Sequence, residues 1–230
     1  MIKKHIPNCI TLLNLFSGFC AILLASKGEL PNAILLMGAA VLFDFCDGLA
    51  ARMLHVKSEL GKQLDSLSDL VSFGVAPASV LYQAFLRNGD FSTEIFGIPV
   101  VPLVACAFFP CMGAVRLGRF NLDERQADNF RGMPIPLAAF ALVSLCTFPA
   151  FPHIGIVYLC TVVLLSALML SDIPLFSLKF KNLRFRENWY RYTLMLAGIL
   201  LFTFLRLSSI LMIVCIYLIL SFIVRKKITI

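Results

Sequence analysis

The chain has 230 residues, of which 60% are hydrophobic and only 14% are charged. Soluble proteins carry roughly 25% charged residues, so this chain has about half the usual amount of water-facing side chain. This balance excludes a disordered chain, a secreted disulfide scaffold and a soluble nucleic-acid-binding protein, although the formal net charge is +7. We therefore expect an integral membrane protein with no nucleic-acid partner.

Apolar runs long enough to cross a bilayer recur along the whole chain. A spanning helix needs about 20 mostly apolar residues. Candidate spans lie at residues 10–26, 32–54, 66–86, 99–118, 134–151, 154–171, 190–206 and 208–224. No internal repeat or separate soluble domain is evident. The expected fold is all-α, a polytopic transmembrane bundle of about eight helices that residues 1–230 form as a single domain.

The basic residues are distributed unevenly between the two ends of these helices. With the N-terminus inside, all Lys and Arg residues fall at the cytoplasmic face except Lys27, Arg87 and Arg206. Cytoplasmic loops of membrane proteins carry an excess of Lys and Arg. The asymmetry therefore predicts an even number of helices with both termini in the cytoplasm.

Four carboxylates are the unusual residues of the chain, because they lie within apolar segments or next to them. They are Asp44, Asp47, Asp65 and Asp69. An acidic side chain costs about 2.5–3.5 kcal/mol at the bilayer centre on insertion scales, so these groups must face water, a cation or one another. One explanation is a structural salt-bridge network with Arg52, Lys57 and Lys62.

The spacing of these residues favours a shared pocket instead. Two helical stripes face each other if the two helices are antiparallel neighbours, as their short connection indicates. The first stripe is Asp44, Asp47, Gly48, Ala51 and Arg52, and the second is Gly61, Asp65 and Asp69. Like charges gathered there repel one another unless divalent cations bridge them, and ligands that are all oxygen favour Mg²⁺ or Mn²⁺. The small residues leave space for a large polar substrate, although close helix packing also explains them.

Taken together, the two stripes resemble the signature of the CDP-alcohol phosphotransferase family. The pattern is Asp44-x-x-Asp47-Gly48-x-x-Ala51-Arg52, eight further residues, and Gly61-x-x-x-Asp65-x-x-x-Asp69. The resemblance implies an integral membrane enzyme, commonly a homodimer. Such enzymes transfer a phosphatidyl or related group from a CDP-linked donor to an alcohol and release CMP.

The resemblance also assigns roles to individual residues. Asp44, Asp47 and Asp65 would hold two divalent cations, and Asp69 would complete the second metal site and accept a proton. The residues that would lie at the CDP part of the donor are Asn8, Thr11, Gly48, Ala51, Arg52, Ser58 and Gly61. For Asn8, capping of the first helix is an alternative.

A second resemblance, within residues 116–136, concerns the acceptor. Arg116-Leu-Gly-Arg119-Phe-Asn121 and the later Gly132-Met-Pro-Ile-Pro136 resemble the phosphatidylserine synthase branch of the family. This implies that the hydroxyl of L-serine attacks CDP-diacylglycerol, giving phosphatidylserine and CMP. Residues that would bind the serine carboxylate or the lipid phosphate are Arg116, Arg119, Asn121 and Arg131. Basic residues at such a helix end also serve as topology anchors.

Other functions remain open on the sequence. The nearest keeps the chemistry and changes the acceptor to glycerol-3-phosphate or an inositol phosphate. A function of another class is a divalent-cation transporter that uses the acidic cluster as its ion site, although such proteins tend to show internal repeats. For the enzyme, we expect membrane lipids around the bundle and an active site that faces the cytoplasm, in a prokaryotic cell membrane.

Overall fold

The computed structural model describes residues 5–56, 58–88, 94–95, 98–122, 130–147, 155–176, 185–205 and 209–228. The N-terminal half contributes α1 (His5–Ser26), α2 (Leu30–Met53), α3 (Glu59–Asp69), the π-helical segment η2 (Leu70–Val75), α4 (Ala76–Asn88) and α5 (Val100–Leu122). The C-terminal half contributes α6 (Ile135–Cys146), α7 (Gly155–Leu170), α8 (Phe185–Leu205) and α9 (Ser209–Ile228). Two short antiparallel pairs join β1 (Glu94–Ile95) to β2 (Ile98–Pro99), and β3 (Phe130–Arg131) to β4 (Pro174–Leu175).

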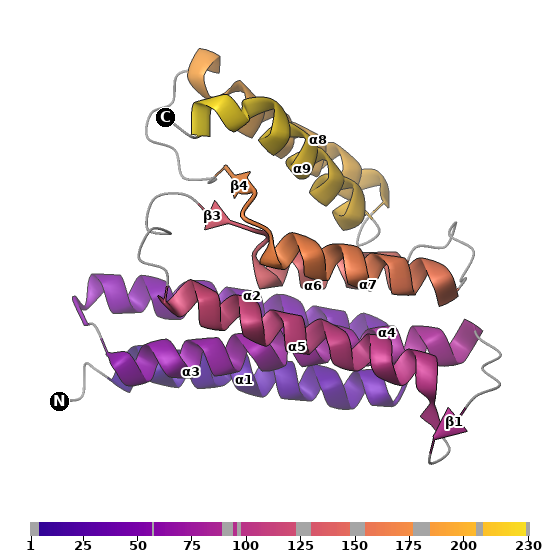
Figure 1. The fold of residues 1–230 in the computed structure, drawn as a ribbon. Coiled ribbons are helices and arrows are strands. Elements are labelled where there is room, and N and C mark those ends of the chain that lie inside the picture. The colour runs from indigo at the N-terminus through magenta and orange to yellow at the C-terminus, as the bar shows by residue number, and fades with distance from the viewer. Residues whose placement is uncertain are drawn as a thin grey trace.

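These helices stack in three layers. Helices α1 to α5 form the lowest layer, α6 and α7 lie on it, and the α8–α9 hairpin lies above them (Figure 1). Because α3, η2 and α4 form one continuous helical run, the described residues contain eight helical runs. The prediction of an all-α bundle of about eight helices is therefore confirmed.

Four of these runs are long and apolar enough to cross a bilayer, namely α1, α2, Glu59–Arg87 and α5, and three shorter apolar helices accompany them. Apolar side chains also cover the outside of the bundle. On α2, Leu35, Leu42 and Phe45 are each more than 60% exposed. Such a surface matches lipid rather than water, and the chain is an integral membrane protein.

Two helices begin earlier in the structure than the sequence predicts. The first helix already includes His5, so Asn8 lies inside α1 and is not its N-cap. The third begins at Glu59 instead of residue 66, because the Ser58 hydroxyl caps it by accepting a hydrogen bond from the Gly61 amide at 3.3 Å. Both shifts place predicted site residues on regular helix, where their side-chain directions are set by the backbone.

The turn between α2 and α3 has a defined helix-ending geometry. The amide of His55 donates to the Arg52 carbonyl at 3.2 Å, and that of Val56 donates to the Ala51 carbonyl at 3.0 Å. His55 adopts a left-handed conformation with φ of 52°, where glycine is usual. This compact turn brings α3 back antiparallel to α2.

Helix α1 packs against both α2 and α3 and continues along η2 and α4. The contact with η2 is a backbone contact, since a Cβ atom on Gly18 would lie only 2.7 Å from the Ser72 Cα. On the other side of η2, a Cβ on Gly74 would lie 3.4 Å from the Pro110 Cα of α5. The π-helical turn is therefore held closely between α1 and α5, one residue beyond Asp69.

Candidate active site

A cavity of about 430 Å³ opens between α1, α2 and α3. The three elements contribute Pro7, Asn8 and Thr11 from α1, then Asp44, Asp47, Gly48 and Ala51 from α2, and Glu59, Gly61, Lys62 and Asp65 from α3. Val56 and Ser58 of the α2–α3 turn complete the lining. Most residues of the two stripes identified in the sequence thus face a common space, with α1 as a third wall, whereas Arg52 and Asp69 are not part of its lining.

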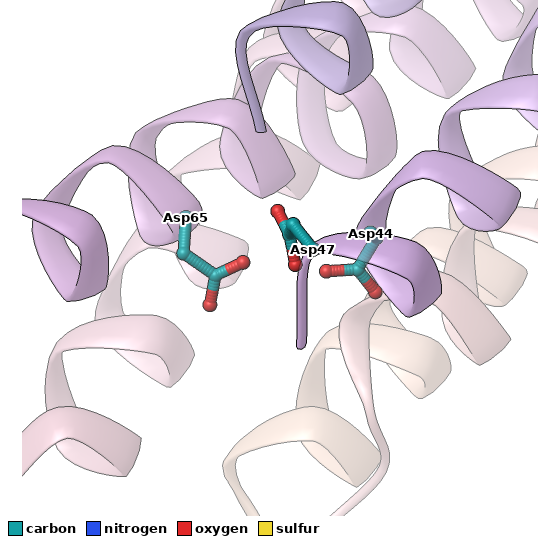
Figure 2. Close-up of side chains that lie close together, drawn as sticks. All are labelled: Asp44, Asp47 and Asp65. Carbon is teal, nitrogen blue, oxygen red and sulfur yellow. The ribbon is translucent and has the colours of Figure 1, made fainter. Parts of the chain in front are cut away.

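Three carboxylates meet in this cavity. Ligand oxygens of Asp44, Asp47 and Asp65 all lie within 4.8 Å of one another, and Figure 2 shows the three side chains directed toward the space between α2 and α3. The carboxylates of Asp44 and Asp65 thus lie close enough to repel each other strongly. Two carboxylates at that separation need a proton or a cation between them. The oxygen donor set fits a hard divalent cation.

The fourth aspartate occupies a different position. Asp69 lies one helical turn beyond Asp65 and is not part of the close group of three. Its Oδ1 accepts a hydrogen bond from the Asn14 Nδ2 of α1 at 3.3 Å. The carboxylate of Asp69 still interacts electrostatically with Asp44 and Asp65, so it belongs to the same charged region.

Helix α1 also orients a carboxylate of the close group. The Thr11 hydroxyl donates to the carboxylate of Asp47 and lies 3.0 Å from the Pro7 carbonyl. Asp47 is 6% exposed and Thr11 is 3% exposed, so this contact is shielded from solvent. Hydrogen bonds of this kind fix the direction in which a metal-ligating carboxylate presents its other oxygen.

Of the seven residues predicted to bind the CDP part of the donor substrate, six line the cavity: Asn8, Thr11, Gly48, Ala51, Ser58 and Gly61. Arg52 is the exception, because its Nε donates to the Gly48 carbonyl at 3.0 Å and the side chain follows its own helix. The two glycines differ. A Cβ on Gly48 would meet nothing within 4 Å, whereas one on Gly61 would lie 3.0 Å from the Asn8 Oδ1.

The cavity lining does not include the predicted acceptor residues whose side chains the structure describes. Arg116 is 6% exposed, and its guanidinium lies 5.2 Å from the centre of the Phe120 ring. Arg119 donates to the Leu170 carbonyl at the end of α7 at 3.3 Å. The predicted role of Arg131 concerns a side chain outside the described residues.

Asn121 ties α5 to α3 next to the carboxylates. Its Nδ2 donates to the Ser66 hydroxyl at 2.7 Å, and its carbonyl accepts from the Lys62 ammonium at 2.8 Å. Lys62 and Arg52, two partners proposed for a salt-bridge network, thus donate to backbone carbonyls in the structure. Among the described residues, this arrangement favours a cation site over a salt-bridge network; Lys57, the third predicted partner, lies outside them.

Sequence reasoning gave no site role to Asn14 or Ser66 and considered Lys62 only as a salt-bridge partner. A signal for Asn14 exists in the spacing of Pro7, Thr11 and Asn14, since intervals of four and three residues fall on one helix face. Polar residues on one face of an otherwise apolar helix indicate the face that turns into the bundle.

The fold and the cavity define a class of protein: an integral membrane helical bundle with a carboxylate site able to hold a divalent cation. Residues 4–173 match the family model described as CDP-alcohol phosphatidyltransferase, and the chain belongs to this family.

Curated relatives agree with this assignment. The chain is 34% identical over 142 residues to the CDP-diacylglycerol–serine O-phosphatidyltransferase of Bacillus subtilis, covering 62% of this chain and 75% of that protein. It is 38% identical over 173 residues to archaetidylserine synthase of Methanothermobacter thermautotrophicus, covering 73% and 68%. The CDP-diacylglycerol–serine O-phosphatidyltransferase of Methanocaldococcus jannaschii is 36% identical over 168 residues, covering 73% and 72%.

Proposed function

We propose that this protein is a CDP-diacylglycerol–serine O-phosphatidyltransferase that makes phosphatidylserine and releases CMP. The observation that carries the proposal is the cavity in which three carboxylates from the two halves of the family signature meet. The names of the relatives, two serine phosphatidyltransferases and an archaetidylserine synthase, support serine as the acceptor.

The carboxylates would hold two divalent cations, Mg²⁺ or Mn²⁺. Asp44, Asp47 and Asp65 offer converging oxygens, and Asp69 would complete the second site from the next turn of α3. When bound, the cations would neutralise the pyrophosphate and stabilise charge on the attacking and leaving oxygens. Phosphoryl-type transfer otherwise asks the protein mainly for positioning.

The CDP group of the donor would lie along the α1–α2 side of the cavity. Gly48 presents its backbone there without a side chain, and the cavity wall on the opposite side is formed by the start of α3. Asn8 and Thr11 supply polar atoms for the nucleotide. Arg52 would have to leave its bond to the Gly48 carbonyl to reach a phosphate.

The transfer itself would be a direct displacement. The serine hydroxyl oxygen forms a bond to the phosphorus that carries diacylglycerol, and the bond from this phosphorus to the bridging oxygen breaks. CMP leaves with that electron pair, and the hydroxyl proton passes to Asp69. An alcohol is a weak nucleophile near neutral pH, so a base at hydrogen-bond distance is required.

Among the residues proposed to bind the acceptor substrate, Arg116 has the strongest support, because its side chain is buried. Its Nε is buried without a hydrogen-bond partner among the described residues, although Phe120 lies against the guanidinium. A buried guanidinium is suited to bidentate recognition of a carboxylate or phosphate. Arg119, Asn121 and Arg131 would complete this acceptor region within residues 116–136.

The remaining features of the proposal concern the whole chain. Residues 1–230 would act as a single domain in a prokaryotic cell membrane, with both termini and the cavity facing the cytoplasm and with a homodimer as the assembly. In Figure 1, α1 begins and α9 ends at the same end of the bundle as the α2–α3 turn. The distribution of Lys and Arg supports the cytoplasmic side for this end.

CMP release by the purified protein tests the function. We expect CMP to form from CDP-diacylglycerol only with both serine and a divalent cation present, and to stop on addition of EDTA. CMP release with glycerol-3-phosphate or an inositol phosphate in place of serine would change the acceptor. Uptake of divalent cations into liposomes without CMP release would refute the enzyme and favour a transporter.

A further inference from the structure

One side chain outside the cavity lining contacts the predicted proton acceptor. Asn14 is fully buried in α1, and its Nδ2 is 3.3 Å from the Asp69 Oδ1. A carboxylate can only accept hydrogen bonds, so the amide group of Asn14 must turn its NH₂ toward it. The Asn14 Oδ1 is then left buried without a hydrogen-bond partner.

A purely structural role explains this residue poorly. An unpaired buried polar atom is destabilising, whereas a leucine of similar size would fill the same space without one. Close packing between α1 and the Asp69 region is already supplied by other residues. Gly18 lets α1 approach η2, and the Ser68 and Ser72 hydroxyls donate to the Thr11 and Asn14 carbonyls at 3.2 and 3.0 Å.

The hydrogen bonds from Ser68 and Ser72 fix the backbone of α1 around Asn14. Ser68 and Ser72 flank Asp69 on one helical run, and both are fully buried. Their bonds to α1 set the distance and rotation between α1 and this run. The Asn14 amide therefore reaches Asp69 from a rigidly held stretch of helix backbone. A residue needs such support if it is to hold a catalytic group in place.

We propose that Asn14 is a positioning residue that holds Oδ1 of Asp69 and leaves its other oxygen free to take the serine hydroxyl proton. This inference rests on the proposed function, because it assigns Asn14 a task in the same reaction. Asp44 and Asp65 repel the Asp69 carboxylate, and without the Asn14 donor it would rotate among several directions. Asn14 does not line the cavity, and its side-chain amide donates to Asp69, so we assign it to positioning and not to substrate binding.

The test begins with the variant Asn14→Leu in the purified full-length protein. A hydrogen bond to a charged group is worth enough to change kcat about ten- to a hundredfold, and we expect a loss of that size. KM for CDP-diacylglycerol should stay within about twofold. Ser17→Ala is the matched control, because Ser17 is 6% exposed on the same face of α1. It should keep kcat within about twofold.

A double variant separates positioning from damage to the fold. If Asn14 acts through Asp69, adding Asn14→Leu to Asp69→Asn should cost little more than Asp69→Asn alone. Full kcat in Asn14→Leu, or a double loss equal to the product of the two single losses, would overturn the proposal. If Asn14→Leu does not fold, Asn14→Ala takes its place in the same cycle.

Binding of Mn²⁺, followed by the EPR signal of the free ion, gives a readout without turnover. Asn14→Leu and Asp69→Asn should weaken the same binding step, and Ser17→Ala should leave it unchanged. Unaltered Mn²⁺ binding in Asn14→Leu alongside weakened binding in Asp69→Asn would count against the proposal. A wild-type protein that binds Mn²⁺ but releases no CMP with serine would refute the proposed function. The comparison of Mn²⁺ binding among the variants would then still test whether Asn14 acts on Asp69.

Discussion

Replacing Gly48 by alanine should make the protein more stable and less active. Gly48 lies in the interior of α2, where glycine is less favourable than alanine by roughly 0.5–1 kcal/mol. A Cβ at this position would meet nothing within 4 Å, so the folded protein can accept the methyl group without strain. For a chain of this length, 1 kcal/mol corresponds to about 2–4 °C in Tm.

The same methyl group would occupy space at the proposed donor site. Gly48 lines the cavity beside Asp44 and Asp47, and a donor bound against this backbone would meet the methyl group at a cost of about 1–3 kcal/mol. We therefore expect the KM for CDP-diacylglycerol to rise about 5- to 150-fold. CMP release at varied donor concentration measures this change, and thermal unfolding in detergent measures the stability.

Gly38→Ala is the control for this experiment. Gly38 is on the same helix, a Cβ there would also meet nothing within 4 Å, and it does not line the cavity. It should gain similar stability and keep the wild-type KM. An unchanged KM in Gly48→Ala, or equal losses in both variants, would refute Gly48 as the wall of the donor site.

Three further changes test other parts of the structure. His55→Gly should raise the free energy of unfolding by about 1 kcal/mol in a denaturation experiment, because it relieves a left-handed φ of 52°; no gain would mean that the turn is not strained. Mn²⁺ at a hundredfold above its Kd should stabilise the wild-type protein by about 2.7 kcal/mol. Asp65→Asn should abolish this stabilisation and should lower CMP release on the order of a hundredfold or more. A variant that Mn²⁺ still stabilises equally would exclude Asp65 as a ligand. Arg119→Ala should lower stability by about 1 kcal/mol, since it removes a bond to the Leu170 carbonyl. If the KM for serine and the KM for the donor both stay unchanged in that variant, Arg119 does not bind the acceptor.

The carboxylate site could be predicted from sequence because helix periodicity alone determines much of it. Asp44 and Asp47 lie three residues apart and fall on one face, and Asp65 follows across a short turn. The high cost of acidic groups in lipid then requires that these faces turn inward. The structure agrees, with ligand oxygens of the three residues within 4.8 Å of one another.

Contacts made by long, flexible side chains could not be predicted in this way. Arg52 shares the stripe of Asp44, yet its side chain bends back to the Gly48 carbonyl. Arg119 reaches the end of α7, which is 51 residues away in sequence. Periodicity places the Cα–Cβ direction of such residues, but the guanidinium lies several rotatable bonds further out and finds whichever carbonyl tertiary packing brings near.

Asn8 and Thr11 of α1 were predicted at the donor, but the part that α1 plays in orienting the carboxylates was missed, for a reason specific to membranes. In water, the apolar face of a helix turns inward, but in lipid apolar side chains can face outward. On α1, Phe16 and Phe19 are 65% and 53% exposed, whereas Thr11 and Asn14 are 3% and 0% exposed. The polar residues that interrupt its apolar run therefore mark its inner face. From this face Thr11 bonds to Asp47 of α2 and Asn14 bonds to Asp69 of α3. A single helix thus orients carboxylates from both halves of the signature, and the spacing within each half could not reveal it.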